Sequence, residues 1–461
     1  MKPEKRTMSL RVSVIGLGKL GCSMAAAMAS KGIDVIGVDI SKRTVELVNQ
    51  YTAPVQETDL DVFIKTNKQR LRATLSHTEA ILNSDISFVI VPTPSDERGA
   101  YSLQYAKWAF REIGRALAEK NGYHLVVLTS TVLPGSTRYG LLPVLEKESG
   151  KKCGVDFGLC YSPEFIALGS IIKNFLNPDF TLVGEFDHAS GEVLEKAYAK
   201  IMTNKPPCQR MSLENAELTK IALNTYVTTK ISYANMLVDL CERLPGGDVD
   251  VVTNAIGFDS RIGKKYLTGA IGYGGPCFPR DNVALGFLSR ELGVDSGIPE
   301  ITDKVNRSII PRVCEKVYKH VSQGDTVAIL GMAYKPFSHV IEESQGAILA
   351  ETLAKTGVRI VVYDPLAADA VKNSFKDLIV VLDTLQDCFD QAKVFLITTP
   401  DPEFKNITAD SFGNKTVVVF DFWRILDSQL NARSNITYIP IGRSINNESN
   451  AMKLAKLWSG N

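Results

Sequence analysis

The chain has 461 residues, of which 45% are hydrophobic and 22% are charged, and its formal net charge is +1. This composition is typical of a globular protein long enough for two or three domains. The charge balance argues against nucleic acid or an acidic membrane surface as the main partner. No apolar run reaches the length of a membrane span. The basic start leads into a glycine-containing stretch, which we interpret as a strand and turn and not as a signal peptide.

Eight cysteines are scattered along the chain, without a CxxC pair and without the histidine spacing of a zinc site. We therefore predict no metal site. Scattered cysteines in a large chain without a signal peptide favour the reducing cytoplasm. The five histidines form no cluster, so we expect catalysis that does not depend on histidine.

The first predicted elements, within residues 11–39, are a strand, a glycine turn, a helix and a second strand. Gly16, Gly18 and Gly21 follow the strand and open the helix, where glycine lets a pyrophosphate approach the positive helix end. Asp39 ends the second strand, eighteen residues past Gly21, and there an acid holds ribose hydroxyls and repels a 2′-phosphate. The pattern predicts an NAD site, although nearby basic residues weaken the preference over NADP. A tight turn without a ligand is the alternative.

Further strands at residues 86–91 and 124–129, with a helix at 103–119 between them, continue the pattern. Alternating strands and helices predict a parallel doubly wound sheet. From Ser212 the pattern changes, because no Gly or Pro occurs until Pro245. This stretch predicts one long helix, and we expect it to link domains and to supply an interdomain or intersubunit face.

A second α/β region follows, with strands predicted within residues 326–335, 358–365, 392–399 and 415–422. It resembles the first region, but Ala333 and Pro336 stand where Gly18 and Gly21 would be. We therefore predict the fold without the dinucleotide turn. The predicted fold class is α/β, with two Rossmann-like doubly wound domains joined by a long central helix.

The stretch GYGGPCFPRD, residues 272–281, combines a sharp turn with one cysteine and one carboxylate. A turn rich in backbone N–H groups favours a nucleophilic thiol. A small buried side chain is the commoner fate of cysteine. For Cys277 with Asp281, the residues alone leave both interpretations open.

Three other features carry candidate chemistry. Lys220 and Asn224 are four residues apart on one helix face, where a cation and an amide could stabilise an oxyanion. The helix pattern alone favours a solvated face on which Lys220 pairs with Glu217. Glu164 follows a predicted strand and a proline, and is either a site acid or a surface acid. The loop at residues 130–137 offers hydroxyls for a nicotinamide and a water, or for helix capping.

Taken in order, several stretches resemble the UDP-glucose/GDP-mannose dehydrogenase family: VIGLGKLG, VPTP, STVLPGST, SPEF, ENAELTKIALN, RIGKKYL, GYGGPCFPRD, LGMAYKP and YDP. They run from Val14 to Pro365, and RSINN near the C-terminus extends the match. The family's fold is two Rossmann-like domains joined by a long helix. The resemblance implies an NAD-binding domain, a central helical dimerisation region carrying the cysteine and a nucleotide-sugar-binding domain, at residues 1–210, 211–312 and 313–461.

The resemblance implies an NAD-dependent four-electron oxidation of a nucleotide sugar's C6 alcohol to the uronate, and UDP-glucose is the first choice of substrate. Cys277 would attack the aldehyde formed by the first oxidation to give a thiohemiacetal. A second oxidation would give a thioester, which water hydrolyses. A thiol suits this chemistry because it adds to an aldehyde and later leaves from an acyl carbon.

The resemblance also assigns catalytic roles. Lys220 and Asn224 would stabilise the oxygen of each tetrahedral species. Asp281 would assist Lys220 and a catalytic water, which Thr131 also holds. Glu164 matches the family's acid/base residue for the hydrolytic step.

The binding residues are implied in the same way. For the cofactor NAD they are Gly16, Gly18, Gly21, Asp39, Val91, Thr93 and Thr131. For the nucleotide sugar they are Glu164, Phe165, Lys220, Asn224, Arg261, Tyr273, Gly274, Lys335 and Arg424. Lys335 and Arg424 would reach the substrate from the second α/β domain. Arg261 would reach the nucleotide sugar of a neighbouring subunit, which implies a homodimer or a larger homo-oligomer.

The chain departs from the family at two places. Family members often read PEFLREG, but Ala167 and Leu168 replace an arginine and a glutamate here. Glu342 stands where an arginine commonly approaches the cofactor. UDP-N-acetyl-hexosamine and GDP-mannose are therefore alternative substrates. A two-electron NAD-dependent dehydrogenase that needs no thiol, and a binding protein without catalysis, are the alternative functions.

Overall fold

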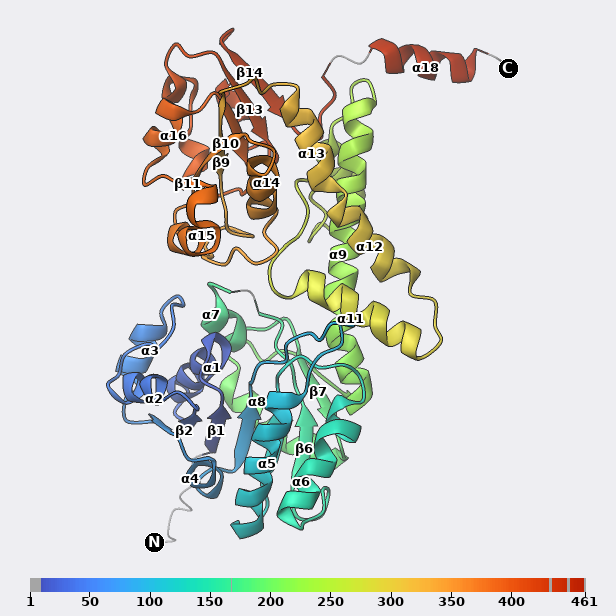
Figure 1. The fold of residues 1–461 in the computed structure, drawn as a ribbon. Coiled ribbons are helices and arrows are strands. Elements are labelled where there is room, and N and C mark those ends of the chain that lie inside the picture. Colours follow the sequence, from blue (N-terminus) through green and yellow to red (C-terminus); the bar gives the residue numbers. More distant parts are fainter. Residues whose placement is uncertain (1–9, 167, 431–432, 446–447, 460–461) are drawn as a thin grey trace. The chain divides into compact units, whose positions relative to one another are not determined.

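A computed structural model describes residues 10–166, 168–430, 433–445 and 448–459. The chain folds into two compact units, residues 1–222 and 223–461, and the boundary between them falls within helix α9 (Leu213–Arg243) (Figure 1).

The first unit is built on an eight-stranded sheet in the order β3-β2-β1-β4-β5-β6-β7-β8. Its strands are β1 (Arg11–Ile15), β2 (Asp34–Val38), β3 (Leu71–Thr74), β4 (Ile86–Val89), β5 (Leu125–Leu128), β6 (Gly158–Tyr161), β7 (Thr181–Glu185) and β8 (Cys208–Ser212). The predicted parallel order is confirmed from β3 to β6, but β6 and β7 pair antiparallel. The chain leaves β6 and enters β7 at the same end of these two strands, so β7 runs antiparallel to β6.

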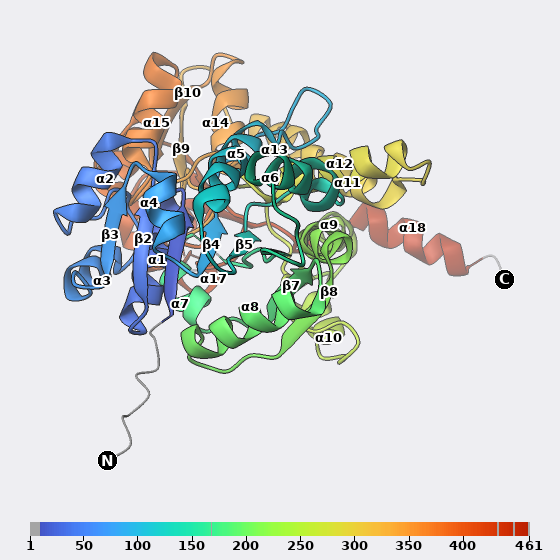
Figure 2. The same ribbon diagram turned by 90° about the horizontal axis from the view of Figure 1, so that it is seen from below.

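Helices cover both faces of this sheet (Figure 2). The apolar side chains of α1, α7 and α8 form the core on one face, and those of α4, α5 and α6 form the core on the other. This layering is the doubly wound arrangement that alternating strands and helices predict. The helices are α1 (Lys19–Ser30), α2 (Lys42–Asn49), α3 (Leu60–Thr66), α4 (His77–Leu82), α5 (Gln104–Glu119), the π-helical segment η1 (Ser136–Leu141), α6 (Leu142–Ser149), α7 (Ile171–Leu176) and α8 (His188–Ile201).

The second unit contains a six-stranded sheet, entirely parallel, in the order β11-β10-β9-β12-β13-β14. Its strands are β9 (Thr326–Leu330), β10 (Arg359–Tyr363), β11 (Val380–Val381), β12 (Val394–Ile397), β13 (Val417–Asp421) and β14 (Ile436–Pro440). Counted from the first strand of each unit, this order repeats that of β3 to β6 in the first sheet. The two Rossmann-like domains and the long helix predicted from the sequence are therefore confirmed.

Helices α10 to α13 precede the first strand of the second sheet in sequence, and helices cover both faces of this sheet (Figure 1). Side chains of α13 and α14 pack on one face, and those of α16 on the other. The helices are α10 (Val249–Gly257), α11 (Phe278–Glu291), α12 (Gly297–Arg307), α13 (Ile309–Tyr318), α14 (Gln345–Ala354), α15 (Ala368–Phe375), α16 (Leu385–Gln391), α17 (Asp427–Leu430), α18 (Glu448–Trp458) and the short 3₁₀ segments η2 (Lys376–Leu378), η3 (Phe404–Asn406) and η4 (Ala409–Phe412).

The long helix α9 begins and ends where its residues predict. Ser212 precedes it and accepts a hydrogen bond from Asn215 N at 3.3 Å, and the helix stops before Pro245. One stripe of α9 is both polar and buried, and it consists of Glu217, Lys220, Asn224 and Thr228. Among the residues that the structure describes, no helix combines the length and apolar character needed to cross a membrane.

Candidate active site

The glycine turn after β1 leaves space where a ligand would bind. A Cβ atom on Gly16 would lie 2.1 Å from the Ile90 carbonyl oxygen, and one on Gly21 would lie 1.9 Å from the Gly16 carbonyl oxygen. Both positions therefore need glycine for packing alone. A Cβ on Gly18 would meet nothing within 4 Å, and Gly18 is the N-cap of α1. Open space at a helix N-terminus fits a pyrophosphate.

Asp39 is held against this turn by two backbone donors. Its carboxylate accepts hydrogen bonds from Leu17 N and Ser41 N, each at 2.8 Å. A carboxylate oxygen has a second lone pair, so Asp39 keeps acceptor capacity for ribose hydroxyls. The residues of the turn thus fit the adenosine side of NAD.

The corresponding acid of the second unit is used differently. Asp364 follows β10, is buried, and accepts hydrogen bonds at 2.7–2.9 Å from four backbone N–H groups, those of Met332, Ala333, Leu366 and Ala367. Its carboxylate oxygens are committed to closing its own turn. This supports the prediction that the second domain has the fold without the dinucleotide turn.

Two loops at the carboxyl ends of β4 and β5 are tied together. Thr93 donates its hydroxyl to the Thr131 carbonyl at 2.7 Å. The Ser130 hydroxyl donates to the Val91 carbonyl at 2.7 Å and accepts from Val91 N at 2.9 Å. The structure therefore brings the predicted cofactor residues Val91, Thr93 and Thr131 to one place.

Glu217 anchors the far end of the second loop, a role that no motif in the sequence predicts. It is fully buried on α9 and accepts hydrogen bonds from Gly135 N at 2.6 Å and Thr137 N at 2.8 Å. Burial raises the pKa of Glu217 to about 7, although these backbone donors oppose the rise. The expected pairing of Glu217 with Lys220 on a solvated face is wrong, because both side chains are buried and Glu217 bonds to the loop.

Glu164, Phe165 and Lys220 lie together in the first unit. Lys220 Nζ donates to the Glu164 carbonyl oxygen at 2.7 Å and lies 4.6 Å from the centre of the Phe165 ring. Although Glu164 as a residue is half-buried, desolvation raises the pKa of its carboxyl group to about 8, and the positive charge of Lys220 limits the rise. A carboxyl group with this pKa is mostly protonated at pH 7 and can move a proton near neutrality.

The family departures lie in two segments. Ala167 is outside the residues that the structure describes, and Leu168 comes just before Gly169, whose N–H donates to Glu57 at 3.0 Å. In the second unit, the Glu342 carbonyl oxygen accepts a hydrogen bond from Gly275 N at 3.0 Å. The departure at Glu342 therefore lies directly against the glycine-rich turn.

That turn presents Cys277 at the start of α11. Gly272 and Gly275 have φ values of +105° and +83°, which disfavour any residue with a Cβ. A Cβ on Gly274 would lie 2.1 Å from the Glu343 carbonyl oxygen. Cys277 is the N-cap of α11 and is exposed, whereas the other seven cysteines are buried or half-buried. The structure thus rejects a small buried cysteine.

Asp281 and Asn224 pair one helical turn from Cys277. Asn224 Nδ2 donates to Asp281 Oδ2 at 2.7 Å, and Asp281 is only 1% exposed. The neighbouring Asn282 Nδ2 donates to the Tyr273 hydroxyl and to Thr228 Oγ1, both at 3.0 Å. Two side chains of α9 therefore bond to two consecutive side chains in the first turn of α11.

Lys335 and Arg261 were both predicted to bind substrate. Lys335 follows Tyr334, whose ring would lie 2.7 Å from a Cβ on Gly275, so this segment packs against the glycine-rich turn. The Arg261 side chain is 86% exposed and pairs with Asp259 at 2.6 Å. An exposed arginine is accessible to a second subunit, and its assigned contact stays a prediction.

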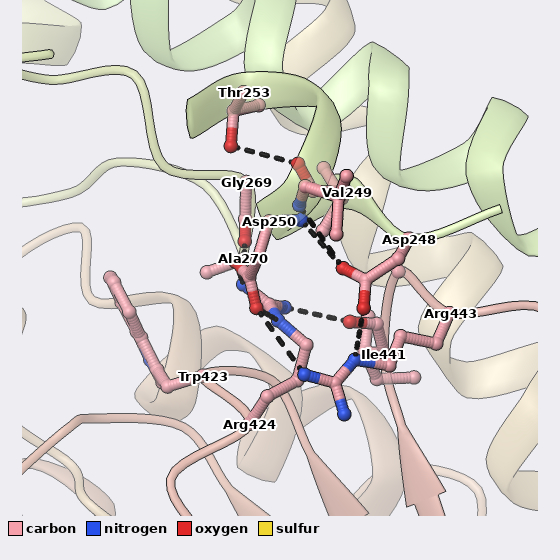
Figure 3. A network of polar contacts seen from close by, with 12 residues as sticks. Asp248, Val249, Asp250, Thr253, Gly269, Ala270, Trp423, Arg424, Ile441 and Arg443 are labelled. Atoms are coloured by element: carbon pink, nitrogen blue, oxygen red, sulfur yellow. Dashed lines mark hydrogen bonds and ion pairs between the residues drawn. The ribbon is translucent and has the colours of Figure 1, made fainter. Parts of the chain in front are cut away.

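Arg424, also predicted to bind substrate, lies in a network of polar contacts within the second unit (Figure 3). Nε and Nη2 bind the Asp250 carboxylate at 2.7 and 2.8 Å, and the remaining N–H groups donate to the Gly269, Phe422 and Ile441 carbonyls. An arginine has five N–H donors, and all five are used here. The side chain is 1% exposed, so every donor is committed to the second unit in this structure, and the assigned substrate contact stays a prediction.

The described residues contain no group of His, Cys, Asp and Glu side chains that could hold a metal ion. The first unit offers a buried ammonium and a dinucleotide turn, and the second unit offers an exposed thiol beside a buried amide and carboxylate. These groups fit covalent chemistry combined with hydride transfer.

Three models of the UDP-glucose/GDP-mannose dehydrogenase family match the chain. They describe the NAD binding domain, the central domain and the UDP binding domain, and they match residues 10–202, 214–308 and 328–428. The chain belongs to this family. The resemblance inferred from its motifs is confirmed, and the protein is an NAD-dependent nucleotide-sugar 6-dehydrogenase.

Relatives of known activity align with about nine tenths of this chain and with nearly their own full length. The UDP-glucose 6-dehydrogenase AglM of Haloferax volcanii is 33% identical over 421 residues, which is 90% of this chain and 97% of the relative. The GDP-mannose 6-dehydrogenase of Pseudomonas putida is 31% identical over 423 residues, 89% of this chain and 95% of the relative. A solved UDP-glucose dehydrogenase from Pyrobaculum islandicum superposes with a TM-score of 0.86 at 29% identity, covering 95% of this chain and 99% of the other.

The candidate site residues of this nucleotide-sugar dehydrogenase are distributed over the three segments that the family models match. The NAD-binding segment holds the glycine turn, Asp39 and Glu164, and the central segment holds α9 and Cys277. The UDP-binding segment holds Lys335. Each match falls inside one predicted domain, whose boundaries stay predictions.

Proposed function

We propose that the protein oxidises the C6 alcohol of UDP-glucose to the carboxylate of UDP-glucuronate, through a covalent intermediate on Cys277. The observation that carries the proposal is the setting of this thiol. It is exposed at the N-terminus of α11, one turn from the buried pair of Asp281 and Asn224. The N-terminus of a helix favours negative charge, which suits a thiolate nucleophile.

The proposed reaction consists of two oxidations and a hydrolysis. The glycine turn and Asp39 would hold NAD⁺, which would supply the hydride acceptor for both oxidations. The alcohol first loses a hydride and a proton to become an aldehyde. The thiolate of Cys277 then adds to the aldehyde carbon, and the oxygen takes up a proton to give a thiohemiacetal. Loss of a second hydride and proton leaves a thioester, and water breaks its C–S bond to release the carboxylate and restore the thiol.

The other residues stabilise charge and move protons. Lys220 and Asn224 stabilise the oxygen of the tetrahedral species, where one lost donor typically costs about 10²–10³ in rate. Asp281 orients Asn224, assists Lys220 and holds the hydrolytic water together with Thr131. Glu164 exchanges a proton in the hydrolysis, for which its pKa of about 8 is well placed.

The substrate assignment rests on the second unit and on the relatives. Tyr273, Gly274 and Lys335, together with Phe165, are the proposed contacts to the nucleotide sugar. The match to a UDP binding domain and the UDP-glucose relatives favour a UDP-sugar. GDP-mannose is the main alternative, because GDP-mannose relatives are nearly as similar. We also propose a homodimer or larger homo-oligomer in which Arg261 reaches the neighbouring subunit's nucleotide sugar.

The test is the amount of NADH formed per nucleotide sugar consumed, measured with UDP-glucose, GDP-mannose and UDP-N-acetyl-hexosamines. We expect two NADH per UDP-glucose from wild type and a stalled second oxidation in Cys277→Ser. Cys208→Ser, which removes a half-buried cysteine, should behave as wild type. One NADH per sugar in all three proteins would favour a two-electron dehydrogenase. Ligand-induced stabilisation without any NADH would favour a binding protein.

A further inference from the structure

The backbone of Tyr273, four residues before the thiol, is held by side chains from two helices of the second unit. Asn306 of α12 accepts a hydrogen bond from Tyr273 N at 3.0 Å and donates Nδ2 to the Tyr273 carbonyl at 3.0 Å. Gln345, the first residue of α14, donates Nε2 to the same carbonyl at 2.9 Å. One carboxamide thus satisfies both polar groups of a residue, as a neighbouring strand would.

This arrangement is enclosed. Asn306 and Gln345 are 4% and 7% exposed. A Cβ on Gly272 would lie 2.5 Å from Asn306 Oδ1, so glycine is needed for the amide to approach. The opposite side of the turn meets the backbone of Glu343 at Gly274.

The side chain of Tyr273 is fixed as well. Its hydroxyl accepts a hydrogen bond from Asn282 Nδ2 on α11, and its ring meets that of Phe278, the residue after Cys277, edge to face at 6.3 Å. Tyr273 therefore connects α12 and α14 to the first turn of the helix that carries the thiol. A displacement of its backbone moves the start of α11.

We propose that Asn306 and Gln345 are positioning residues that hold the 272–277 turn so that Cys277 captures the aldehyde before it leaves the enzyme. The inference rests on the proposed function, because only a covalent second oxidation needs this capture. Both side chains bond to the backbone of Tyr273, four residues from the sulfur. Their effect comes through the placement of sulfur, and a misplacement of about 1 Å can cost about 100-fold in such a step.

The experiment compares Asn306→Ala and Gln345→Ala with a matched control. In the first unit, Asn49 holds Ala73 through the same pair of bonds, N–H to Oδ1 at 2.8 Å and Nδ2 to carbonyl at 2.9 Å. Asn49→Ala therefore removes the same pair of bonds, at an exposed position far along the chain from the thiol. The readouts are NADH formed per UDP-glucose and aldehyde trapped with semicarbazide.

We expect Asn306→Ala to slow the second oxidation by about 10–100-fold relative to the first, so that NADH per sugar falls from two towards one and trapped aldehyde appears. Gln345→Ala should shift the ratio in the same direction but less, since Asn306 still holds both groups. Asn306→Asp, which keeps the acceptor for Tyr273 N, should restore part of the ratio. Asn49→Ala should form two NADH per sugar whatever its melting temperature.

Two outcomes are distinguishable. If wild type forms two NADH and both alanine variants, still folded, also form two without trapped aldehyde, the positioning role is wrong and the proposed function stands. If wild type itself does not form two, the proposed function fails and the inference with it. Alkylation of Cys277 by iodoacetamide gives a readout without substrate: its rate should change in Asn306→Ala and not in Asn49→Ala, and equal rates would contradict the inference.

Discussion

Asn224 donates its side-chain amide to the buried carboxylate of Asp281 at 2.7 Å, while the backbone N–H of Asp281 donates to the carbonyl oxygen of Cys277. The carboxylate thus links the amide proposed for oxyanion stabilisation to the helical turn that presents the thiol. A buried carboxylate that loses its donor bears the full cost of desolvation. Asn224 therefore helps to keep Asp281 in place, in addition to the role proposed for it in the chemistry.

Asn224→Ala should lower kcat for both oxidations by about 10²–10³ and lower the free energy of unfolding by about 1–3 kcal/mol. Single-turnover absorbance at each NADH step and urea unfolding would measure the two effects. Asn215→Ala, at an exposed position near the start of the same helix, is the control and should change neither. Unchanged rates in Asn224→Ala would remove the residue from the proposed mechanism.

Iodoacetamide should alkylate one thiol of the native protein much faster than the rest. Cys277 is exposed, Cys208 is half-buried and the others are buried, and burial blocks access to a thiol. Peptide mass mapping after a short reaction should locate the label on Cys277, with loss of activity in proportion. Cys277→Ser should abolish the fast phase, and Cys208→Ser should keep it. Fast labelling of a buried cysteine would contradict the described turn.

Glu164 makes stability depend on pH. Because burial raises its pKa in the folded protein from 4.5 to about 8, the folded state binds the proton more tightly than the unfolded state. Stability from this group is fully present below about pH 4.5 and is lost as pH rises through 8. The free energy of unfolding of Glu164→Gln should therefore be about 1–3 kcal/mol higher than that of wild type at pH 9 and equal to it at pH 4.

Thermal melts across this pH range would test the difference, with Glu119→Gln at an exposed position of α5 as the control. In turnover, Glu164→Gln should slow the hydrolysis and accumulate the thioester, seen as added mass on Cys277. A melting difference that is independent of pH would show that the carboxyl group is not desolvated.

The sequence predicted the secondary elements well because their signals are local. Periodicity and the absence of Gly and Pro predicted α9, and the glycine turn with Asp39 predicted the NAD site, whose family match is confirmed. Helical spacing also placed Lys220 and Asn224 on one face. It could not show that this face is buried, because a polar stripe looks the same whether it meets water or other polar groups.

The missed residues depend on contacts between distant segments. The family resemblance assigned Arg424 to the substrate, and no motif could show its partner Asp250, which lies 174 residues away in sequence. Asn306 lies 33 residues from Tyr273 and belongs to no motif. Only the three-dimensional arrangement identifies such pairs.

Asp39→Asn should weaken the preference for NAD⁺. The variant removes the negative charge that would repel a 2′-phosphate, and it places an amide donor beside Leu17 N or Ser41 N, which now donate to the carboxylate. We expect the KM for NAD⁺ to rise about tenfold, which is about 1.4 kcal/mol, and the discrimination against NADP⁺ to fall by a similar factor. The control is Asp34→Asn, at the start of the strand that leads to Asp39, where Asp34 forms a partly exposed ion pair with Arg70. It should leave the KM for NAD⁺ and the discrimination against NADP⁺ unchanged. Equal discrimination in all three proteins would contradict the assigned role.

Arg424→Ala should destabilise the protein without a specific effect on substrate binding. It leaves three carbonyls without their donor, whereas Asp250, whose side chain is 34% exposed, keeps Arg443 at 3.8 Å, so we expect a loss of about 1–3 kcal/mol. Asp250→Ala should cause a loss of similar size. The double variant should lose less than the sum, because the second substitution removes an interaction that is already gone.

The KM for UDP-glucose separates this stabilising role from the substrate contact implied by the family resemblance. Arg424→Lys retains a positive charge beside Asp250 but cannot supply five N–H donors. If the residue acts only in the fold, Arg424→Lys and Asp250→Ala should both lower the melting temperature, and each should leave the KM within about twofold of wild type at a temperature where it is folded. A KM that rises more than about tenfold in Arg424→Lys alone, which is more than 1.4 kcal/mol, would restore Arg424 to the substrate site and would mean that its guanidinium exchanges Asp250 for the nucleotide when the substrate binds.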